Sequence, residues 1–419
     1  MASKHYLVGG AAAFLAAAAI TACTKTKEVN MTAPADPLFA SYVSLGNSLT
    51  AGMQSAGIND STQVEAYPVL FAQSASTRFA QPLLSKPGCP PPIDNFITQT
   101  RVTPAGYPTS TSTSCYLRGP SSVTSVLNDV AVPGAWSFDP TSLTSYGSNA
   151  LTTFVLGGLT QVQRALQANP TFVSVWIGNN DVLLPASAGI LTKTIIPGAP
   201  PDTISMGVTT QAAFVTNYSN MIKGLLTSST LKGGVLFAVV QVAGAPRFFP
   251  AHYLLDSADI RASFEAMAGT PVLVDPSCAN PLVLLSVQYA QYIANATFPP
   301  VVMCKKGTVP ANPLFGDLFV LDSVETPQLI AAINAYNVYI QAKADSLGWA
   351  YVDVNPAVAQ LKAAGAIPPF PILTQPTKAF GDYITLDGVH ISGLAHKLVA
   401  NLMIDSVNAR YGTNLQPIP

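Results

Sequence analysis

Five short apolar runs, separated by stretches whose apolar residues recur at helical spacing, constrain most strongly how this chain can fold. They lie at residues 42–45, 130–135, 172–177, 235–240 and 350–354. A nearly unbroken apolar run such as 172–177 is typical of a strand buried on both faces of a parallel sheet. Strands that alternate with helices build parallel sheets with helices on both faces. The sequence therefore predicts an α/β protein, a three-layer α/β/α sandwich around a central parallel five-stranded sheet.

Polar or flexible residues follow these predicted strands. Ser48 comes after the first strand, Gly134 ends the second, Asn180 follows the third, and a loop around His390 precedes the last helix. A lone Gly-x-Ser tripeptide is a weak signal, because most such tripeptides mark ordinary turns. In open α/β sheets, however, ligands bind at the carboxyl ends of the strands. The expected convergence of these positions at one sheet edge is the strongest argument for a functional site.

Ser48 is the candidate nucleophile, and a nucleophilic serine needs a base that titrates near neutral pH. His390 is the best candidate base, because Asp387 lies three residues earlier across a flexible glycine and can hold the imidazole in the required tautomer. The alternative is that Asp387 caps the last helix and His390 is only structural. We expect His396 at the surface and His252 near the substrate.

An oxyanion formed at an ester carbonyl needs prearranged hydrogen-bond donors. The backbone N–H groups of Ser48 and Gly134 and the side-chain amide of Asn180 would supply three of them. The alternative for Asn180 is a turn asparagine that bonds its own backbone. We expect Asp181 to be a structural partner of that turn rather than a catalytic group.

Four blocks, in this order, resemble the conserved blocks of GDSL-type esterases and lipases of the SGNH hydrolase superfamily. They are Gly46-Asn47-Ser48-Leu49, Ala131-Val132-Pro133-Gly134-Ala135, Gly178-Asn179-Asn180-Asp181 and Asp387-Gly388-Val389-His390. The resemblance spans about residues 40 to 410. The chain departs from the family at Asn47, where aspartate is usual, and at Asp129, where asparagine is frequent; the first position is not a member of the family's triad.

This resemblance implies a serine esterase or lipase that acts through an acyl-enzyme intermediate and needs no metal or organic cofactor. The triad would be Ser48, Asp387 and His390. A polysaccharide O-acetyl esterase and a non-catalytic binding lipoprotein on the same fold remain alternatives. An ordinary α/β-hydrolase arrangement fits less well, because Thr50 interrupts the Gly-x-Ser-x-Gly pattern and the acid lies in the same block as the base.

We expect one hydrolase domain over residues 38–412, followed by a short tail at 413–419. Three segments lack sustained periodicity and would be long, lid-like insertions, at about 76–125, 183–207 and 245–326. The third is apolar, and some of its residues are candidates for an acyl-binding wall or, alternatively, for a small core under the insertion. These candidates are Phe248, Phe249, His252, Tyr253 and the run 282–285. On the first interpretation, lipophilic acyl esters are the favoured substrates.

The amino terminus has the pattern of an export signal. Lys4 precedes an apolar run over residues 7–20, which is shorter than the ~20 residues a spanning helix needs and ends in small residues before Cys23. Residues 20–23 resemble a bacterial lipobox, which implies cleavage after residue 22 and lipid attachment to Cys23, with 23–37 as a tether. We therefore expect an exported protein, lipid-anchored to a bacterial outer membrane or cell surface; a single-span anchor is the alternative.

Four cysteines remain beyond Cys23, an even number that suggests two disulfides in an exported chain. Three pairings are possible. We favour the local ones, Cys89 with Cys115 and Cys278 with Cys304, because each would staple a proline-rich loop with little core of its own. A zinc site is the rival, but no Cys-x-x-Cys or nearby histidine pair supports it.

Composition excludes one large class of function. Only 10% of the 419 residues are charged and the formal net charge is −1. Such a chain has no basic face with which to neutralise a phosphate backbone, so we expect no nucleic-acid binding. The 49% hydrophobic content is ample for a sizeable core.

Overall fold

The computed structural model describes residues 33–116, 126–143, 150–191, 207–295, 300–306 and 319–419. Its central sheet is parallel, in the order β1-β2-β3-β9. These strands are β1 (Tyr42–Gly46), β2 (Phe172–Trp176), β3 (Gly233–Phe237) and β9 (Ala350–Val352). The residues of β1, β2 and β3 are all buried, as the unbroken apolar runs predict. The predicted mixed α/β fold with a parallel sheet is confirmed.

The sheet has four strands in the described part of the chain, and not the five that we predicted. The segment 130–135 does run beside β1: the Val130 N–H donates to Ser44 O at 3.0 Å, and the Val132 N–H donates to Gly46 O at 3.1 Å. Only one bridge, between Ser44 and Asp129, is formed there. Pro133 has no N–H to continue the ladder, and Gly134 turns the chain away at φ +83°. The segment is therefore an edge contact that stops short of a strand.

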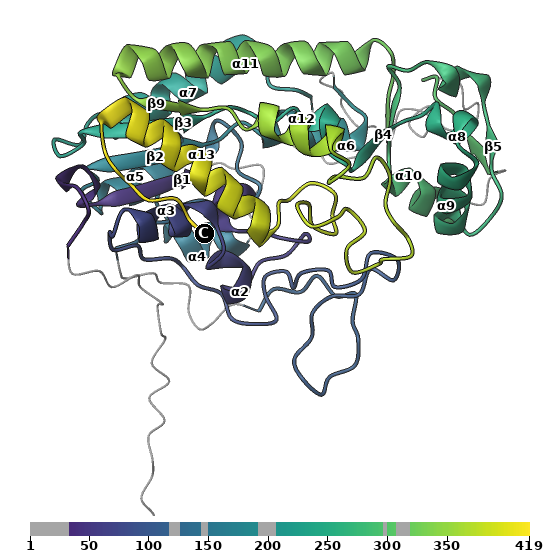
Figure 1. Ribbon diagram of the computed structural model, residues 1–419, viewed down its shortest axis with the longest axis horizontal. Helices are drawn as coiled ribbons and strands as arrows, with labels where there is room; N and C mark the ends of the chain where they lie inside the picture. The colour runs from purple at the N-terminus through teal and green to yellow at the C-terminus, as the bar shows by residue number, and fades with distance from the viewer. Residues whose placement is uncertain (1–32, 117–125, 144–149, 192–206, 296–299, 307–318) are drawn as a thin grey trace, which may run out of the picture.

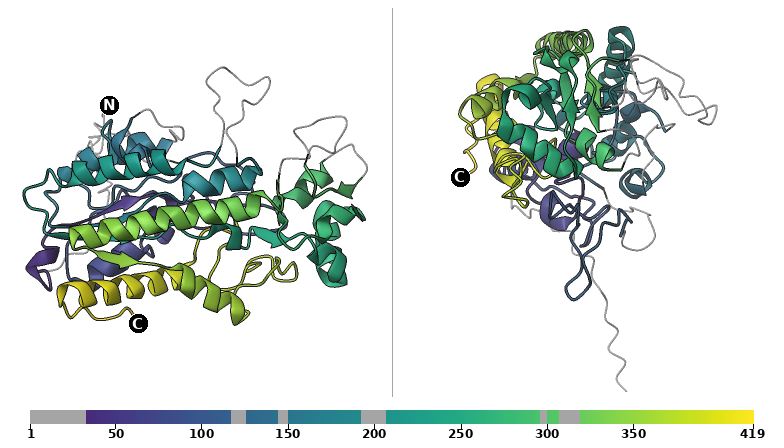
Figure 2. Two further views of the ribbon diagram at one scale, coloured as in Figure 1. Left: turned by 90° about the horizontal axis from the view of Figure 1, so that it is seen from above. Right: turned by 90° about the vertical axis from the view of Figure 1, so that its right-hand side faces the viewer.

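Side chains that alternate along the strands divide the main core into two layers. Val43, Val173 and Leu236 face one side, where they pack with α5 (Gln161–Leu166), α7 (Gln211–Leu225) and α11 (Glu325–Leu347). Trp176 and Phe237 face the other side, where they pack with α3 (Tyr67–Ser74) and α13 (Gly393–Tyr411). Figures 1 and 2 show these two helix layers on either side of the sheet. The expected three-layer arrangement is present.

The helices of the main body connect the strands of the central sheet or follow the last of them. They are α1 (Ser48–Ala51), α2 (Asp60–Gln63), α3 (Tyr67–Ser74), α4 (Ala150–Leu156), α5 (Gln161–Leu166), α6 (Asn180–Ala188), α7 (Gln211–Leu225), α11 (Glu325–Leu347), α12 (Asn355–Ala363) and α13 (Gly393–Tyr411). Thr160 caps α5 in a reciprocal capping box with Gln163, and the Ser392 hydroxyl accepts from the Ala395 N–H at the start of α13. Gly348 ends α11 with a left-handed φ of +68°.

The third insertion forms a lobe of its own at one end of the molecule, at the right in Figure 1. Its elements are β4 (Phe248–Pro250), α8 (Tyr253–Asp256), α9 (Ala258–Ala268), β5 (Leu273–Val274), β6 (Leu284–Ser286), α10 (Gln288–Ala294), β7 (Val301–Val302) and β8 (Val320–Leu321). Strands β4, β6 and β8 form an antiparallel sheet, and β5 pairs with β7 in parallel. A separate apolar cluster holds the lobe to the first insertion through Phe96 and to the last loop through Phe370 and Phe380.

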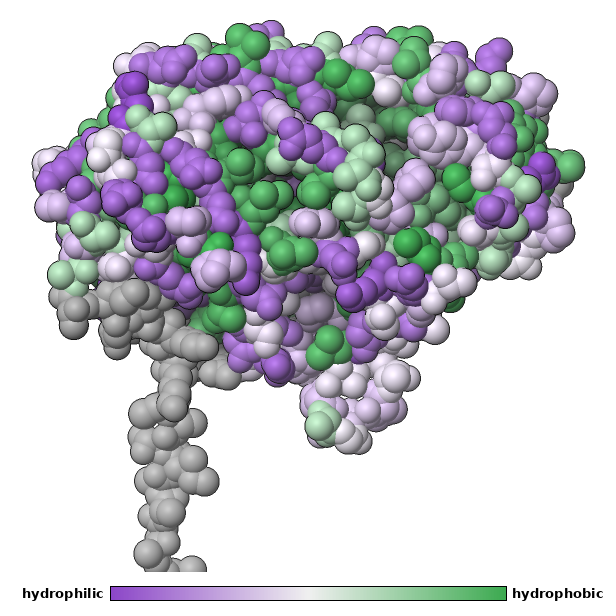
Figure 3. All heavy atoms as spheres, in the orientation of Figure 1, coloured by the Kyte–Doolittle hydropathy of each residue, from purple (hydrophilic) through white to green (hydrophobic). Residues whose placement is uncertain are grey.

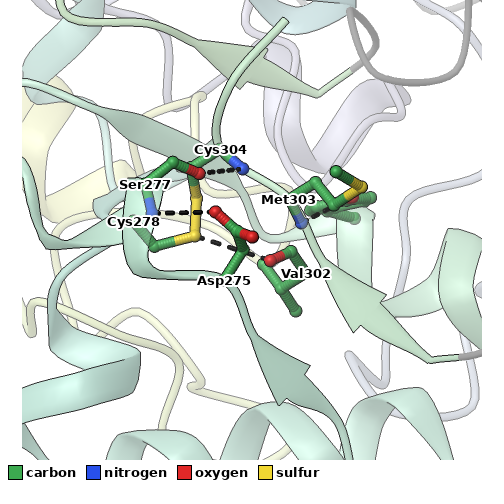
Figure 4. The surroundings of a disulfide bond; sticks show 7 residues. Asp275, Ser277, Cys278, Val302, Met303 and Cys304 are labelled. Carbon is green, nitrogen blue, oxygen red and sulfur yellow. Dashed lines mark hydrogen bonds between the residues drawn. A yellow bond between two sulfur atoms is a disulfide. The ribbon is translucent and has the colours of Figure 1, made fainter. Parts of the chain in front are cut away.

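Both local disulfides are present, Cys89 with Cys115 and Cys278 with Cys304. Figure 4 shows the second, which joins the short 3-10 helix Pro276–Ala279 to the segment after β7. Polar contacts reinforce the junction: the Ser277 N–H donates to Asp275 Oδ1 at 2.8 Å, and the Cys304 N–H donates to Ser277 Oγ at 3.3 Å. The strands of this lobe are only two or three residues long and contribute little stability. The disulfide stabilises the lobe because it restricts the conformations of the unfolded chain.

Several expectations concern residues outside the described ranges. These are the signal segment 1–22, Cys23 with most of the tether, and the greater part of the second insertion. Within the described ranges, no helix is both long enough and apolar enough to cross a membrane. The tail 413–419 packs back on α13, because Leu415 is buried and the Ile418 N–H donates to Asn401 Oδ1 at 2.7 Å.

Candidate active site

Ser48 lies at the point where β1 ends and α1 begins. The side chain of Asn47 caps α1 by accepting from the Leu49 N–H at 3.2 Å. Gly46 must lack a side chain here, because a Cβ would lie 2.2 Å from Thr50 Oγ1 and 2.8 Å from Trp176 O. This tight turn directs Ser48 to the carboxyl edge of the sheet, where its side chain is 8% exposed. The close packing around Gly46 therefore explains why a glycine precedes the candidate nucleophile by two residues.

His390 is held by Asp387 in the loop before α13. Nδ1 of the imidazole lies 2.6 Å from Asp387 Oδ2, and Asp387 Oδ1 accepts from the N–H groups of Val389 and His390 at 2.9 and 2.8 Å. Gly388 adopts φ +72°, which lets the carboxylate turn back onto the imidazole within one short turn. Asp387 does not cap the last helix, because Ser392 does so. The alternative that Asp387 caps this helix is therefore wrong, and the catalytic role of His390 stays a prediction.

The Asp387 carboxylate is charged over the whole physiological range. Burial by itself would raise its pKa, but the neighbouring His390 and the two backbone N–H donors outweigh burial and hold the pKa well below the usual value. A fixed negative charge beside Nδ1 keeps the proton on that nitrogen in the neutral imidazole. Nε2 is then left as the basic atom.

Ser48 and His390 line the same cavity, together with Asn47, Asn179 and Asn180. His390 Nε2 is buried and has no hydrogen-bond partner in this structure, so it is not bonded to Ser48 Oγ here. Catalytic hydrogen bonds often form only once substrate is bound, so an open arrangement in a ligand-free site is compatible with general-base catalysis. The arrangement offers an unpaired base and a hydroxyl in one enclosed space.

The predicted oxyanion donors are partly brought together. Asn180 is the first residue of α6, lines the cavity, and donates from Nδ2 to Ala135 O at 2.8 Å. This bond fixes the amide against the Gly134 turn and leaves its second N–H free to donate. The turn-asparagine alternative is wrong, because the side chain reaches a different segment. Gly134 is not among the residues that line the cavity.

Asn179 is a site residue that sequence analysis missed. Its Oδ1 accepts from the Val240 N–H at 2.9 Å, which fixes the side chain, while its Nδ2 is buried without a partner. Asn47 Nδ2 is likewise buried and unpaired, and both residues line the cavity. A buried donor without a partner costs about 1–3 kcal/mol, so such groups call for an explanation. The sequence shows that Asn179 and Asn180 are adjacent, but it does not show which of their side-chain amides lacks a hydrogen-bond partner.

The acyl-binding wall that we expected in the third insertion is wrong. Phe248 and Phe249 are buried in core clusters and His252 and Tyr253 lie on the lobe, where His252 Nδ1 bonds Asp256 Oδ2 at 2.7 Å. None of them lines the cavity with Ser48. The alternative, a small core under the insertion, holds for Phe249, which packs in the cluster of the lobe, whereas Phe248 packs in the main core.

The cavity wall comes instead from the strand ends and from the two helices α12 and α13. Figure 3 shows apolar side chains gathered between these helices on the face of Figure 1. No residue of α12 is fully buried, yet one side of this helix faces the cavity. The apolar lining includes Leu49, Trp176, Leu183, Val240, Val242, Val354, Ala357, Val358, Leu361, Ile384, Leu398 and Leu402.

Two buried aspartates support the site without touching it. Asp181 accepts from the Ser137 N–H and hydroxyl at 2.8 and 2.6 Å, so its carboxylate holds the segment after Gly134 and not, as we had expected, its own turn. Burial raises its pKa to about 6. Burial likewise raises the pKa of Asp129 to about 7, although the Ala131 N–H and the Ser44 hydroxyl both donate to it.

His396 is fully buried, contrary to our expectation of a surface residue. Its Nδ1 accepts from the Tyr67 N–H at 3.3 Å, and burial lowers its pKa to about 3. His396 is covered because α3 packs on this side of α13. Within the described residues, no three histidine, cysteine, aspartate or glutamate side chains gather as a metal site.

No protein-family model matches the chain, and no curated protein matches its sequence. Solved structures do match. An acetylxylan esterase from Geobacillus stearothermophilus is 10% identical with a TM-score of 0.36, over 88% of this chain and 94% of that one. LAE5, an alpha/beta hydrolase enzyme from the metagenome of Lake Arreo, is 11% identical with a TM-score of 0.36, over 89% and 98%. At this identity and TM-score the likeness assigns neither a family nor an activity to this chain.

Proposed function

We propose that the chain is a serine esterase in which Ser48 is the nucleophile, His390 the general base and Asp387 the group that orients it. The observation that carries this proposal is the unpaired, buried Nε2 of His390, in the same cavity as the Ser48 hydroxyl, with Nδ1 fixed on Asp387 at 2.6 Å. A base with one nitrogen fixed and the other free is what proton transfer from serine requires.

The chemistry follows from these positions. Ser48 Oγ bonds to the ester carbonyl carbon as its proton passes to His390 Nε2, and Asp387 stabilises the resulting imidazolium. Collapse of the tetrahedral intermediate breaks the bond to the alcohol, which leaves with the proton from Nε2. A water molecule then attacks the acyl-enzyme, gives its proton to Nε2, and the acid is released as Ser48 regains the proton.

The oxyanion would be held by the Ser48 N–H and the free N–H of Asn180. The first belongs to the amino-terminal turn of α1, and the second is aimed by Ala135 O. The unpaired Asn179 amide is a further donor on the same cavity. Gly134 would act on this site only through a shift of its turn, because it does not line the cavity here.

We infer that lipophilic acyl esters are the substrates, and the lining of the cavity supports this inference. Its wall is formed mainly by aliphatic side chains, and His390 is the one ionisable lining residue apart from Tyr383. Burying each methylene of an acyl chain there would contribute ~0.8 kcal/mol of binding. The polysaccharide O-acetyl esterase is the competing function, and would gain little from such a wall.

Export as a Cys23-anchored lipoprotein remains our proposal for the location of the protein. The two disulfides support it, because disulfides persist mainly in oxidising compartments outside the cytosol.

The test is hydrolysis across a panel of esters. Acyl chains from acetyl to dodecanoyl on one alcohol, together with acetylated xylan, would be compared for the parent chain and Ser48→Ala. We expect kcat/KM to rise with acyl length until the cavity is filled, and to vanish in the variant. Best activity on acetylated glycan would replace the lipophilic proposal, and full activity in Ser48→Ala would end the esterase mechanism.

A further inference from the structure

A second cavity lies beside the candidate triad, because Asp387 lines it and Ser48 does not. It has a volume of about 130 Å³ and is lined by Arg101, Arg247, Gln288, Gln291, Phe96 and Asp387 itself, among others. The two guanidinium groups come from the first insertion and from the segment before β4. Its lining is thus both cationic and partly apolar, unlike that of the cavity with Ser48.

Asp387 does not neutralise these arginines by direct pairing. Its Oδ1 accepts from two backbone N–H groups, and its Oδ2 accepts from His390 Nδ1 and from the Ala56 N–H. Neither guanidinium hydrogen-bonds the carboxylate; Arg247 Nη1 reaches only the backbone oxygen of Asp387, at 3.4 Å. Two positive charges therefore face one negative charge whose lone pairs are already used.

The arginines are also left with unused donors. Arg247 Nη2 donates to Gln288 Oε1, but its Nε is buried without a partner. Arg101 donates through Nη1 to Ala56 O at 3.0 Å and Pro91 O at 2.6 Å, both uncharged acceptors. Burial lowers the pKa of both side chains, which reflects the cost of keeping them charged there. The Asp387 charge acts against this effect on both guanidinium groups but does not outweigh burial, so a further anion would stabilise them.

We propose that this cavity is a binding site for a small organic carboxylate, held by Arg247 and Arg101 with its apolar end against Phe96. Guanidinium groups match the planar, two-oxygen geometry of a carboxylate. The amide groups of Gln288 and Gln291 add neutral donors at the rim. Binding does not depend on the proposed esterase function.

Calorimetric titration of the full chain in detergent tests the site directly. Sodium acetate and sodium butyrate would be compared with sodium phosphate at constant ionic strength. We expect saturable binding of the carboxylates at one site, tighter for butyrate. No saturable heat, or binding of phosphate alone, overturns the proposal.

Variants locate the binding. Arg247→Gln should weaken butyrate binding at least tenfold, and Gln288→Glu should abolish it by placing a carboxylate beside the Arg247 guanidinium. Lys223→Gln removes the same charge from the exposed side of α7 and should leave the affinity unchanged. If Arg247→Gln does not fold, Gln288→Glu still tests the proposal, because unchanged butyrate binding in that variant would show that the carboxylate does not bind in this cavity. Butyrate binding in a chain without esterase activity would retain this site and reject only the proposed function.

Discussion

His390 Nδ1 lies 2.6 Å from Asp387 Oδ2, while the other nitrogen of the same ring is buried and unpaired. A second pair, His252 with Asp256 at 2.7 Å, has the same chemistry, but its aspartate side chain is 66% exposed and neither residue lines the cavity with Ser48. Burial and placement, more than the pairing itself, therefore distinguish the candidate base.

Removal of a triad member should abolish ester hydrolysis. We expect Ser48→Ala and His390→Ala to lower kcat by ~10³-fold or more, because the three groups act as a unit. Asp387→Asn should lose somewhat less. Steady-state kinetics with circular dichroism checks this. His252→Ala and Ser346→Ala are matched controls, and loss of activity in either without loss of fold would contradict the assignment.

Asn180→Ala should lower kcat by ~10²-fold with little change in KM, because an oxyanion donor acts mainly on the charge that develops in the transition state. Steady-state rates on one ester measure both constants. A rise in KM alone would make Asn180 a residue that binds the ground state.

Narrowing the cavity at α12 should change acyl preference. Ala357 lines the cavity, so Ala357→Trp is expected to shift the best substrate to shorter acyl chains, each excluded methylene costing up to ~0.8 kcal/mol. Ala359→Trp, on the exposed side of the same helix, is the control. An unchanged chain-length profile in Ala357→Trp would place the acyl group elsewhere.

Asp129 should make the protein less stable as pH rises. Its pKa is about 7 in the folded state against an ordinary 3.8, so the folded protein binds the proton more tightly than the unfolded chain does. That contribution is fully present below about pH 4 and is lost as pH rises towards 7, by a few kcal/mol. Urea unfolding between pH 4 and 8 should show a flatter pH dependence for Asp129→Asn. The exposed Asp405→Asn is the control, and an equal flattening in it would refute the assignment.

Mass spectrometry of protein extracted from membranes checks the export prediction. We expect an amino terminus at a lipidated Cys23 and no free thiol, since the remaining four cysteines are paired. A terminus at Met1 would contradict the lipoprotein proposal.

Much of the main body was predictable because its signals are local. The apolar runs at 42–45, 172–177, 235–240 and 350–354 placed β1, β2, β3 and β9. The prediction of a fifth strand was wrong because Pro133 and the Gly134 turn interrupt the pairing with β1 after one bridge. The apolar content of the segment does not show how far the pairing extends. The disulfides could be preferred on loop length, but three pairings were open until the fold brought the sulfurs together.

The sequence by itself determined the positions of Ser48, Asp387 and His390 as candidates, because the turn after β1 and the three-residue spacing across Gly388 can be recognised from adjacent residues. Only the tertiary structure decided what surrounds them. It moved the cavity wall from the third insertion to α12 and α13, and left Asn179 with an unpaired amide. It also gathered Arg101 and Arg247 beside Asp387. These contacts join segments far apart along the chain, and burial, which sets their energies, depends on how the whole chain packs.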